Sequence, residues 1–171
     1  EKVLFVKGKL RDENNKRVTD AIIKFKNMET KEVHEVDVDT LTGDYVAVMN
    51  FSSDFVMTVE SKEAAFTSRY LAKTDTSLDR IQKMNVEVKK VKVGEPYRLH
   101  NINFGLDSYE LDETSKKVIA EFAVYLELHP TIKVAIHGHT DNTGITASNM
   151  KLSTDRAKAV YDHLVAQGIK T

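Results

Sequence analysis

A run of small and polar residues, His137-Gly-His-Thr-Asp-Asn-Thr-Gly144, follows the apolar segment that ends at Ile136. Its carboxylate, Asp141, and the guanidinium of Arg156 further along the chain could act together. An amino-acid head group needs an anion for its ammonium and a cation for its carboxylate. Asp141 would bind the ammonium, and the planar fork of Arg156 would bind the carboxylate through charge-assisted hydrogen bonds. The alternative is a salt bridge between Asp141 and Arg156 that only ties a loop to a helix.

The elements around these two residues are predicted to bring them together. Ile132–Ile136 has the pattern of a buried strand, which places Asp141 in the loop at its carboxyl end, where open α/β sheets bind ligands. Gly138 permits a close backbone approach or an unusual φ angle. Arg156 would lie about two turns inside the next helix, some ~10 Å from its start at 1.5 Å per residue, and could reach back to this loop.

Two helices and two strands are expected in the second half of the chain. A strand over Leu99–Phe104 would precede a helix that Asp112 or Thr114 caps and that runs to about Leu128, before Pro130. The second helix is predicted to start near Ser148 or Asn149 and to run to Gln167. Its apolar stripe is Leu152, Ala157, Val160 and Leu164, and Gly168 is its predicted C-terminal cap. The order is β-α-β-α.

The first half has the period of two that is typical of strands. Short strands separated by turn residues are expected at 2–10, 21–25, 32–39, 45–49, 55–59 and 66–71. This spacing predicts an all-β sandwich over residues 1–73. Residues 74–96 are interpreted as a linker with one or two strands.

Composition excludes several classes of protein. The 171 residues are 41% hydrophobic and 30% charged, and no apolar run approaches the ~18 residues of a membrane helix. The net charge of −1 argues against a nucleic-acid binder that relies on a bulk positive field. The absence of cysteine excludes disulfides, thiolate nucleophiles and zinc–thiolate sites.

Residues 97–171 resemble a known family. The matching motifs are Leu99-x-Asn-Ile-x-Phe104, Ser108-x-x-Leu111, Ile136-x-Gly138-His139-Thr140-Asp141-x-x-Gly144, Asn149-x-x-Leu152-Ser153-x-x-Arg156-Ala157 and Gly168-Ile169. They are similar to those of the OmpA-like C-terminal domain. The resemblance implies an α+β domain that binds peptidoglycan without catalysis, through the meso-diaminopimelate of the stem peptide. Such domains anchor the outer membrane of Gram-negative bacteria to the cell wall, which implies a periplasmic location.

The resemblance also assigns roles to residues. It implies that Asp141 and Arg156 clamp the amino-acid head of diaminopimelate, with further contacts from Thr140, Asn149 and Asp107. Family members often carry an acidic residue where this chain has Gly105, so that contact would be absent or taken over by Asp107. No cofactor and no metal are implied. The family's last strands are not found before Thr171, so the domain is expected to be C-terminally incomplete.

The N-terminal half resembles the carboxypeptidase regulatory-like β-sandwich, a transthyretin-like fold. The similar motifs are Gly8-x-x-x-Asp12, Asp20-Ala21-x-Ile23-x-Phe25, Thr30 and Gly43-x-Tyr45. Such domains are spacers or docking modules. Their combination with an OmpA-like domain is typical of Bacteroidetes-type envelope proteins, some of which serve type IX secretion and gliding. Outer-membrane or secretion-machine proteins are therefore expected as further partners.

Two other functions stay open at the level of sequence. One is a pure protein–protein docking module of a secretion or gliding apparatus. The other is a zinc hydrolase, because His137, His139 and Asp141 would share one face of an extended strand and resemble part of the metallo-β-lactamase motif. Against the hydrolase, Asn142 stands where that motif has its final histidine, and the chain is short for that fold. Ser153 has no base nearby in the sequence and is interpreted as a helix residue that bonds locally.

Overall fold

The computed structural model describes residues 3–75, 81–140 and 145–170. The chain divides into two compact units, residues 1–100 and residues 101–171. The elements in chain order are β1 (Val3–Asp12), β2 (Ile22–Asn27), β3 (Val33–Asp37), β4 (Asp44–Asn50), β5 (Phe55–Glu60), β6 (Ser68–Leu71), β7 (Gln82–Lys83), β8 (Val86–Val88), α1 (Glu113–Leu128) and α2 (Thr146–Ala166).

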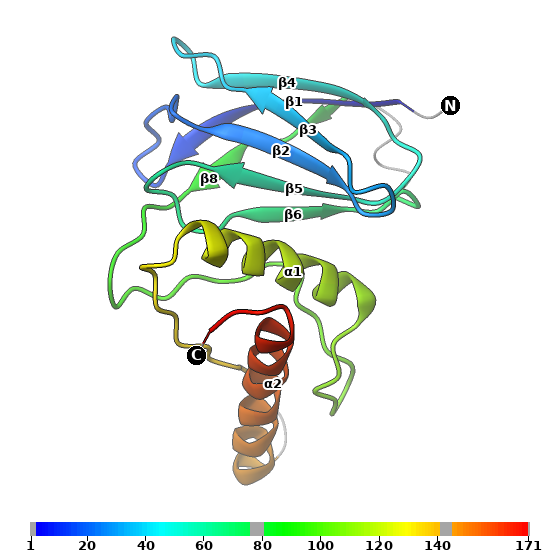
Figure 1. Ribbon diagram of the computed structural model, residues 1–171, viewed down its shortest axis with the longest axis vertical. Helices are drawn as coiled ribbons and strands as arrows, with labels where there is room; N and C mark the ends of the chain where they lie inside the picture. The colour runs from blue at the N-terminus through cyan, green and yellow to red at the C-terminus, as the bar shows by residue number, and fades with distance from the viewer. Residues whose placement is uncertain (1–2, 76–80, 141–144, 171) are drawn as a thin grey trace. The chain divides into compact units, whose positions relative to one another are not determined.

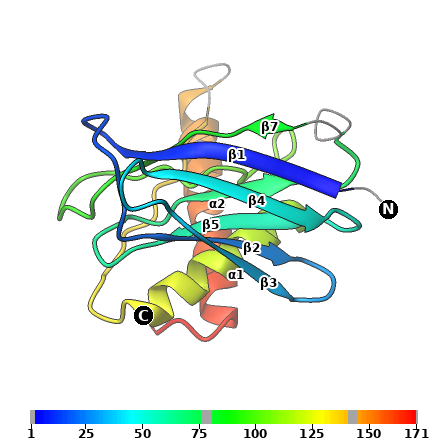
Figure 2. The same cartoon turned by 90° about the horizontal axis from the view of Figure 1, so that it is seen from above.

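The first unit contains two sheets (Figure 1). In one, β1 lies between β4 and β7, and β8 also pairs with β1; the other has the order β3-β2-β5-β6. Figure 2 shows β1 flanked by β4 on one side and β7 on the other. The strands β7 and β8 fall within the predicted linker, residues 74–96, and pair with β1 in parallel. Residues 82–83 and 86–88 are therefore part of the sheet of the first unit.

Alternation along the strands produces the core of this unit. In β1, Leu4 and Val6 are buried while Phe5 and Lys7 are exposed, as a period of two requires. Buried side chains from both sheets form one apolar cluster, with Phe25 of β2 and Met57 of β5 fully enclosed. The sequence prediction of a β-rich first half is confirmed.

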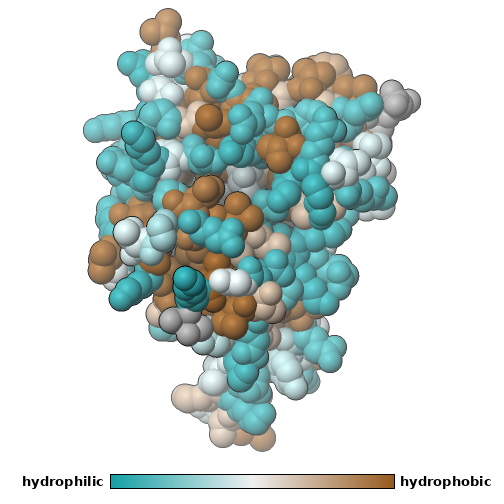
Figure 3. Space-filling view, viewed as in Figure 1, coloured by the Kyte–Doolittle hydropathy of each residue, from teal (hydrophilic) through white to brown (hydrophobic). Residues whose placement is uncertain are grey.

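The outer face of the β1–β4 pair is also partly apolar. Phe5 lies opposite Val48 in the antiparallel register, and these two side chains are 44% and 56% exposed. Val46, one position along the same face of β4, is 65% exposed. In Figure 3, brown hydrophobic atoms lie along the upper edge of the molecule, where Figure 1 shows β4. This sheet therefore has apolar side chains on both of its faces.

The second unit is helical among the residues described. Asp112 caps α1, because its carboxylate accepts a hydrogen bond from the backbone N–H of Ser115 at 2.6 Å. The buried face of α1 comprises Ser115, Val118, Ile119, Phe122, Ala123 and Leu126. The helix α2 runs at a steep angle to α1 (Figure 1) and buries only Val160 and Leu164. No helix within the described residues combines the length and apolar character of a membrane span.

Both ends of α2 can be compared with their predictions. The helix starts at Thr146, two residues before the predicted start, so Asn149 lies one turn inside it. At the other end Gly168 has φ +97°, and its N–H donates to the carbonyl of Val165. The N–H of Ile169 donates to the carbonyl of Leu164. These two bonds complete a Schellman motif, so the predicted glycine cap is confirmed.

The two strands predicted in the second half are wrong. Residues 99–104 form no ladder, and Phe104 makes only an isolated bridge with Leu111. Residues 132–136 are not a strand either, and Val134 is 46% exposed rather than buried. A strand exists only where a neighbouring strand accepts and donates ladder hydrogen bonds, and no such neighbour lies within the described part of this unit. The predicted β-α-β-α order is replaced there by two helices and the loops around them.

Candidate ligand-binding site

Arg156 gathers the loops of the second unit around its guanidinium. Its Nε donates to the carbonyl of Ser108 at 2.9 Å, and its two Nη atoms donate to the carbonyls of Gly105 at 3.2 Å and His139 at 3.4 Å. The guanidinium carbon lies 5.0 Å from the centre of the Phe104 ring, a cation–π distance. One side chain on α2 thus joins residues 104–108 to the segment that leads into Asp141.

The arginine retains hydrogen-bonding capacity after these contacts. A guanidinium has five N–H donors, and the bonds to Gly105, Ser108 and His139 use three. Each Nη atom therefore has one further N–H that could donate to a carboxylate. Among the described residues no carboxylate forms an ion pair with Arg156. The adjacent Asp155 pairs with Lys151 at 2.9 Å, an interaction that raises the pKa of Lys151.

Ser115 holds the 101–103 segment that leads into this loop. The side chain is fully buried, and its Oγ accepts from the backbone N–H of Asn103 at 2.8 Å. The Ser115 hydroxyl also lies 3.2 Å from the carbonyl of Asn103 and 3.4 Å from that of Asn101. A residue at the start of α1 therefore fixes the backbone just before Phe104. Sequence inspection missed this role, because a serine near a helix start is ordinary.

Gly138 brings the 137–140 segment against α2. A Cβ on this glycine would stand 2.1 Å from the carbonyl oxygen of Ser153 and 3.1 Å from the backbone nitrogen of Ala157. Both are backbone atoms that cannot rotate away. Of the two predicted reasons for a glycine here, close backbone approach is therefore the correct one. Ser153 bonds within its own helix, donating from Oγ to the carbonyl of Met150 at 2.9 Å.

Of the five predicted site residues, all but Asp141 lie in the described part of the chain. Asp107 is exposed with φ +49° and lies between Gly105 and Ser108, whose carbonyls accept from Arg156. Thr140 follows His139, a third carbonyl partner. Asn149 lies two turns before Arg156 on α2 and therefore on the same side of the helix. Asp141 lies outside the described residues.

The candidate zinc site receives no support from the described residues. Within residues 3–75, 81–140 and 145–170, no group of three histidine or carboxylate side chains is arranged to hold a metal ion. His137 and His139 are both exposed. The third member of the sequence motif, Asp141, is outside these ranges.

The comparison with protein families bears on the unit that contains Arg156. The sequence model of the OmpA family matches residues 103–171. These residues form an OmpA family domain. The match begins next to Phe104 and includes both helices and every described partner of Arg156.

Curated relatives match the chain over about the same length as this OmpA domain. The peptidoglycan-binding protein ArfA of Mycobacterium tuberculosis is 41% identical over 68 residues, which are 40% of this chain and 21% of that protein. The peptidoglycan-associated lipoprotein of Pasteurella multocida is 32% identical over 73 residues, 43% of this chain and 49% of that protein. Outer membrane porin F of Pseudomonas aeruginosa is 37% identical over 65 residues, 38% of this chain and 19% of that protein. The chain spans half or less of each of these relatives.

Proposed function

We propose that the OmpA domain is a non-catalytic binding module for peptidoglycan. It recognises the meso-diaminopimelate of the stem peptide and so anchors an outer-membrane protein or envelope machine to the wall, in the periplasm of a Gram-negative bacterium. The observation that carries this proposal is the fixed guanidinium of Arg156, which has N–H donors to spare. Relatives that are named for peptidoglycan binding or association support it.

In the proposed clamp, Arg156 binds the carboxylate of the amino-acid head and Asp141 binds its ammonium. Three carbonyls and the Phe104 ring already hold the arginine, so little side-chain entropy remains to be lost on binding. Thr140, Asn149 and Asp107 contribute polar contacts around the head group. Affinity for one stem peptide is modest, and the many stems of the polymer raise it through avidity.

The β unit is proposed to act as a spacer or docking module of the carboxypeptidase regulatory-like type. It would separate the wall-binding unit from the rest of an envelope protein of the Bacteroidetes type, including those of type IX secretion. Outer-membrane or secretion-machine proteins would then be its partners. Two sheets around a shared apolar core support a rigid spacer.

The test compares Arg156→Gln with Lys158→Gln. Both remove one positive charge from α2, but Lys158 only pairs with Asp162 on the exposed face of the helix. Binding is measured by co-sedimentation with purified sacculi and by amide NMR titration with meso-diaminopimelate, with L-lysine as the control ligand. We expect Arg156→Gln to weaken binding at least tenfold, Asp141→Asn to do the same, and Lys158→Gln to bind like the parent chain.

Folding must be separated from binding, because Arg156 also bonds to three carbonyls. Arg156→Lys keeps a cation near Phe104 but lacks the planar fork. A dispersed spectrum with lost diaminopimelate binding in Arg156→Lys would support the clamp. Undiminished sacculus binding by folded Arg156→Lys and Arg156→Gln would overturn it.

A further inference from the structure

The β unit has an open hollow lined by positive side chains. Arg11 at the end of β1, Lys16 and Arg17 in the following loop, and Leu41 and Thr42 before β4 border it, together with Asn15. Its volume is about 610 Å³. The lining includes three cations and no carboxylate. We call this cavity, whose cations are Arg11, Lys16 and Arg17, the basic hollow.

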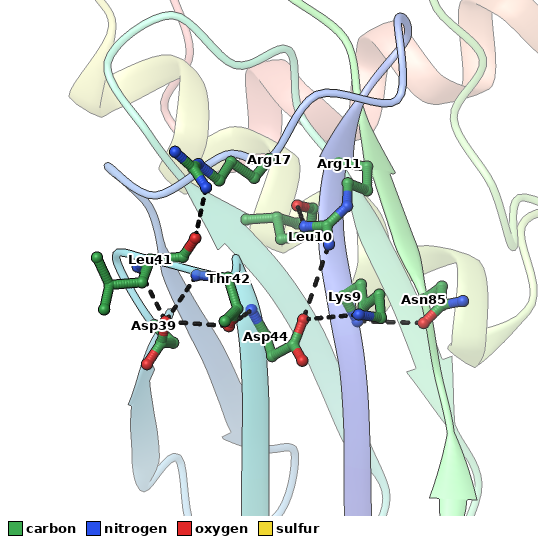
Figure 4. Close-up of polar contacts among 9 residues, drawn as sticks. All are labelled: Lys9, Leu10, Arg11, Arg17, Asp39, Leu41, Thr42, Asp44 and Asn85. Atoms are coloured by element: carbon green, nitrogen blue, oxygen red, sulfur yellow. Dashed lines mark hydrogen bonds and ion pairs between the residues drawn. The ribbon is translucent and has the colours of Figure 1, made fainter.

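Both guanidinium groups are held by backbone carbonyls. Arg17 donates from Nη1 to the carbonyl of Leu41 at 2.6 Å, and Arg11 donates from Nη1 to the carbonyl of Leu10 at 3.0 Å (Figure 4). A carbonyl fixes the position of a cation without cancelling its charge. Each guanidinium therefore keeps most of its charge for another group.

Gly43 lies against the side chains of both arginines. A Cβ at this position would stand 2.4 Å from Nη1 of Arg11 and 3.0 Å from Cβ of Arg17. The backbone there has φ +70°, which other residues rarely adopt. A side chain at residue 43 would therefore take the space that the Arg11 guanidinium occupies.

Of the neighbouring carboxylates, only that of Asp44 pairs with a cation of the basic hollow among the described residues. Asp44 lies 3.2 Å from Nζ of Lys9 and 3.8 Å from Arg11, so it offsets part of the Arg11 charge (Figure 4). Asp39 accepts from the N–H groups of Leu41 and Thr42, bonds that lower the pKa of Asp39. Asp12 accepts from the N–H groups of Asn14 and Lys16. Among the described residues, no ion pair joins a carboxylate to Lys16 or Arg17.

We propose that the basic hollow binds an oxyanion, a carboxylate or phosphate group carried on a larger molecule. Arg17 and Arg11 supply planar N–H donors, and Lys16 supplies a point charge from the loop between them. Polar and charged residues on loops at one end of a rigid sandwich are well placed for such binding. This site is separate in sequence from Arg156 and does not depend on the function proposed for the OmpA domain.

The experiment is an amide NMR titration of the whole chain in the Arg156→Gln background. One arm uses inorganic phosphate, and the other uses a soluble muropeptide, which carries carboxylates. We expect saturable shifts at amides of residues 11–17 and 41–43 that weaken as salt is added. A response to phosphate alone assigns the site to phosphate groups, and a response to the muropeptide alone assigns it to carboxylates.

Variants decide whether the response comes from the hollow. Lys16→Gln removes a cation whose side chain has no described bond, so the turn should keep its structure, and we expect binding to weaken about tenfold. Arg17→Gln should weaken it at least as much. Lys62→Gln, an exposed lysine of the same unit, is the matched control and should leave binding unchanged. The absence of saturable shifts with both probes, or an equal loss in Lys62→Gln, would overturn the proposal.

Discussion

Arg156 has a structural role in the OmpA domain, and the proposed function gives it a binding role as well. Its guanidinium bonds to the carbonyls of Gly105, Ser108 and His139 and still has unused N–H groups. A carboxylate ligand would therefore meet a cation that is already oriented. The backbone around it is equally constrained, because Gly138 lies in contact with α2.

Gly138→Ala should destabilise the OmpA domain by about 2–3 kcal/mol, because the added methyl group overlaps backbone atoms of Ser153. Urea denaturation followed by amide signals of α2 measures the loss. Gly105→Ala is the control, since its Cβ would lie 3.4 Å from the Cβ of Ser108, an ordinary contact. Equal stability of the two variants would show that the segment at Gly138 is not packed in this way.

Tyr45 is buried in the β unit, and its hydroxyl donates to the carbonyl of Met84 at 2.5 Å. Burial raises the pKa of Tyr45 from 10.0 to about 12. The folded state therefore keeps the phenol proton between pH 10 and 12, while the unfolded state loses it. The stability of the β unit should fall over that range by about 2–3 kcal/mol.

The Tyr45→Phe variant isolates this effect from the titration of lysines. At pH 8 the variant should unfold with a free energy about 1 kcal/mol lower, because the Met84 carbonyl loses its hydrogen-bond donor. Above pH 10 its stability should fall less steeply than that of the parent chain, because the contribution of Tyr45 to that fall is absent. Urea unfolding of both proteins at pH 8, 10 and 11.5 provides the comparison. Parallel curves for the two proteins above pH 10 would contradict the assignment.

Among the elements, the start of α1 connects the helix to the candidate site. Asp112 caps the helix through the N–H of Ser115, and the hydroxyl of Ser115 binds the backbone of residue 103. The helix end and the loop before Phe104 therefore share one residue. Packing of α1 fixes Ser115, since Val118 and Ile119 next to it are fully buried.

Ser115→Ala should therefore destabilise the domain by about 1–3 kcal/mol, because the N–H of Asn103 loses its buried acceptor. On the proposed function it should also weaken diaminopimelate binding, since the 104–108 loop is less well held against Arg156. Thermal unfolding and the NMR titration measure both effects. Thr114→Ala, at a partly exposed position on the same turn, is the control; a similar loss in that variant would argue against a specific tether.

Across the whole molecule, each unit has its own set of buried apolar residues. The main cluster extends from Leu4 to Val88 and lies within the first unit, whereas the buried faces of α1 and α2 lie in the second. Stability should therefore respond unit by unit to substitution. We expect Tyr45→Phe to speed amide exchange in the strands, and Gly138→Ala to speed it in the helices. Equal acceleration throughout the chain by either variant would show that the units unfold together.

Much of this organisation follows from local patterns in the sequence. A period of two predicted the strands of the β unit, since alternation with solvent on one side encodes burial directly. Asp112 and Gly168 marked the beginning of one helix and the end of the other through their capping preferences. For Gly138 the sequence left a close backbone approach and an unusual φ angle open, and the contact with Ser153 decided between them. The position of Arg156 on a helix predicted that its side chain reaches back toward the preceding segment, where it bonds to the carbonyl of His139.

Tertiary structure decided the features that depend on distant partners. Residues 99–104 and 132–136 have the composition of strands, but composition cannot supply the neighbouring strand that a ladder needs. Every residue has a backbone carbonyl, so the sequence does not reveal which carbonyls bind Arg156. The path of the 104–108 loop, in which Asp107 has φ +49°, directs the carbonyls of Gly105 and Ser108 to its guanidinium. The basic hollow likewise arises because the turn at Gly43 folds back onto Arg11 and Arg17. Side-chain type and short-range spacing are written in the sequence, whereas the direction of backbone groups is set by contacts between segments far apart along it.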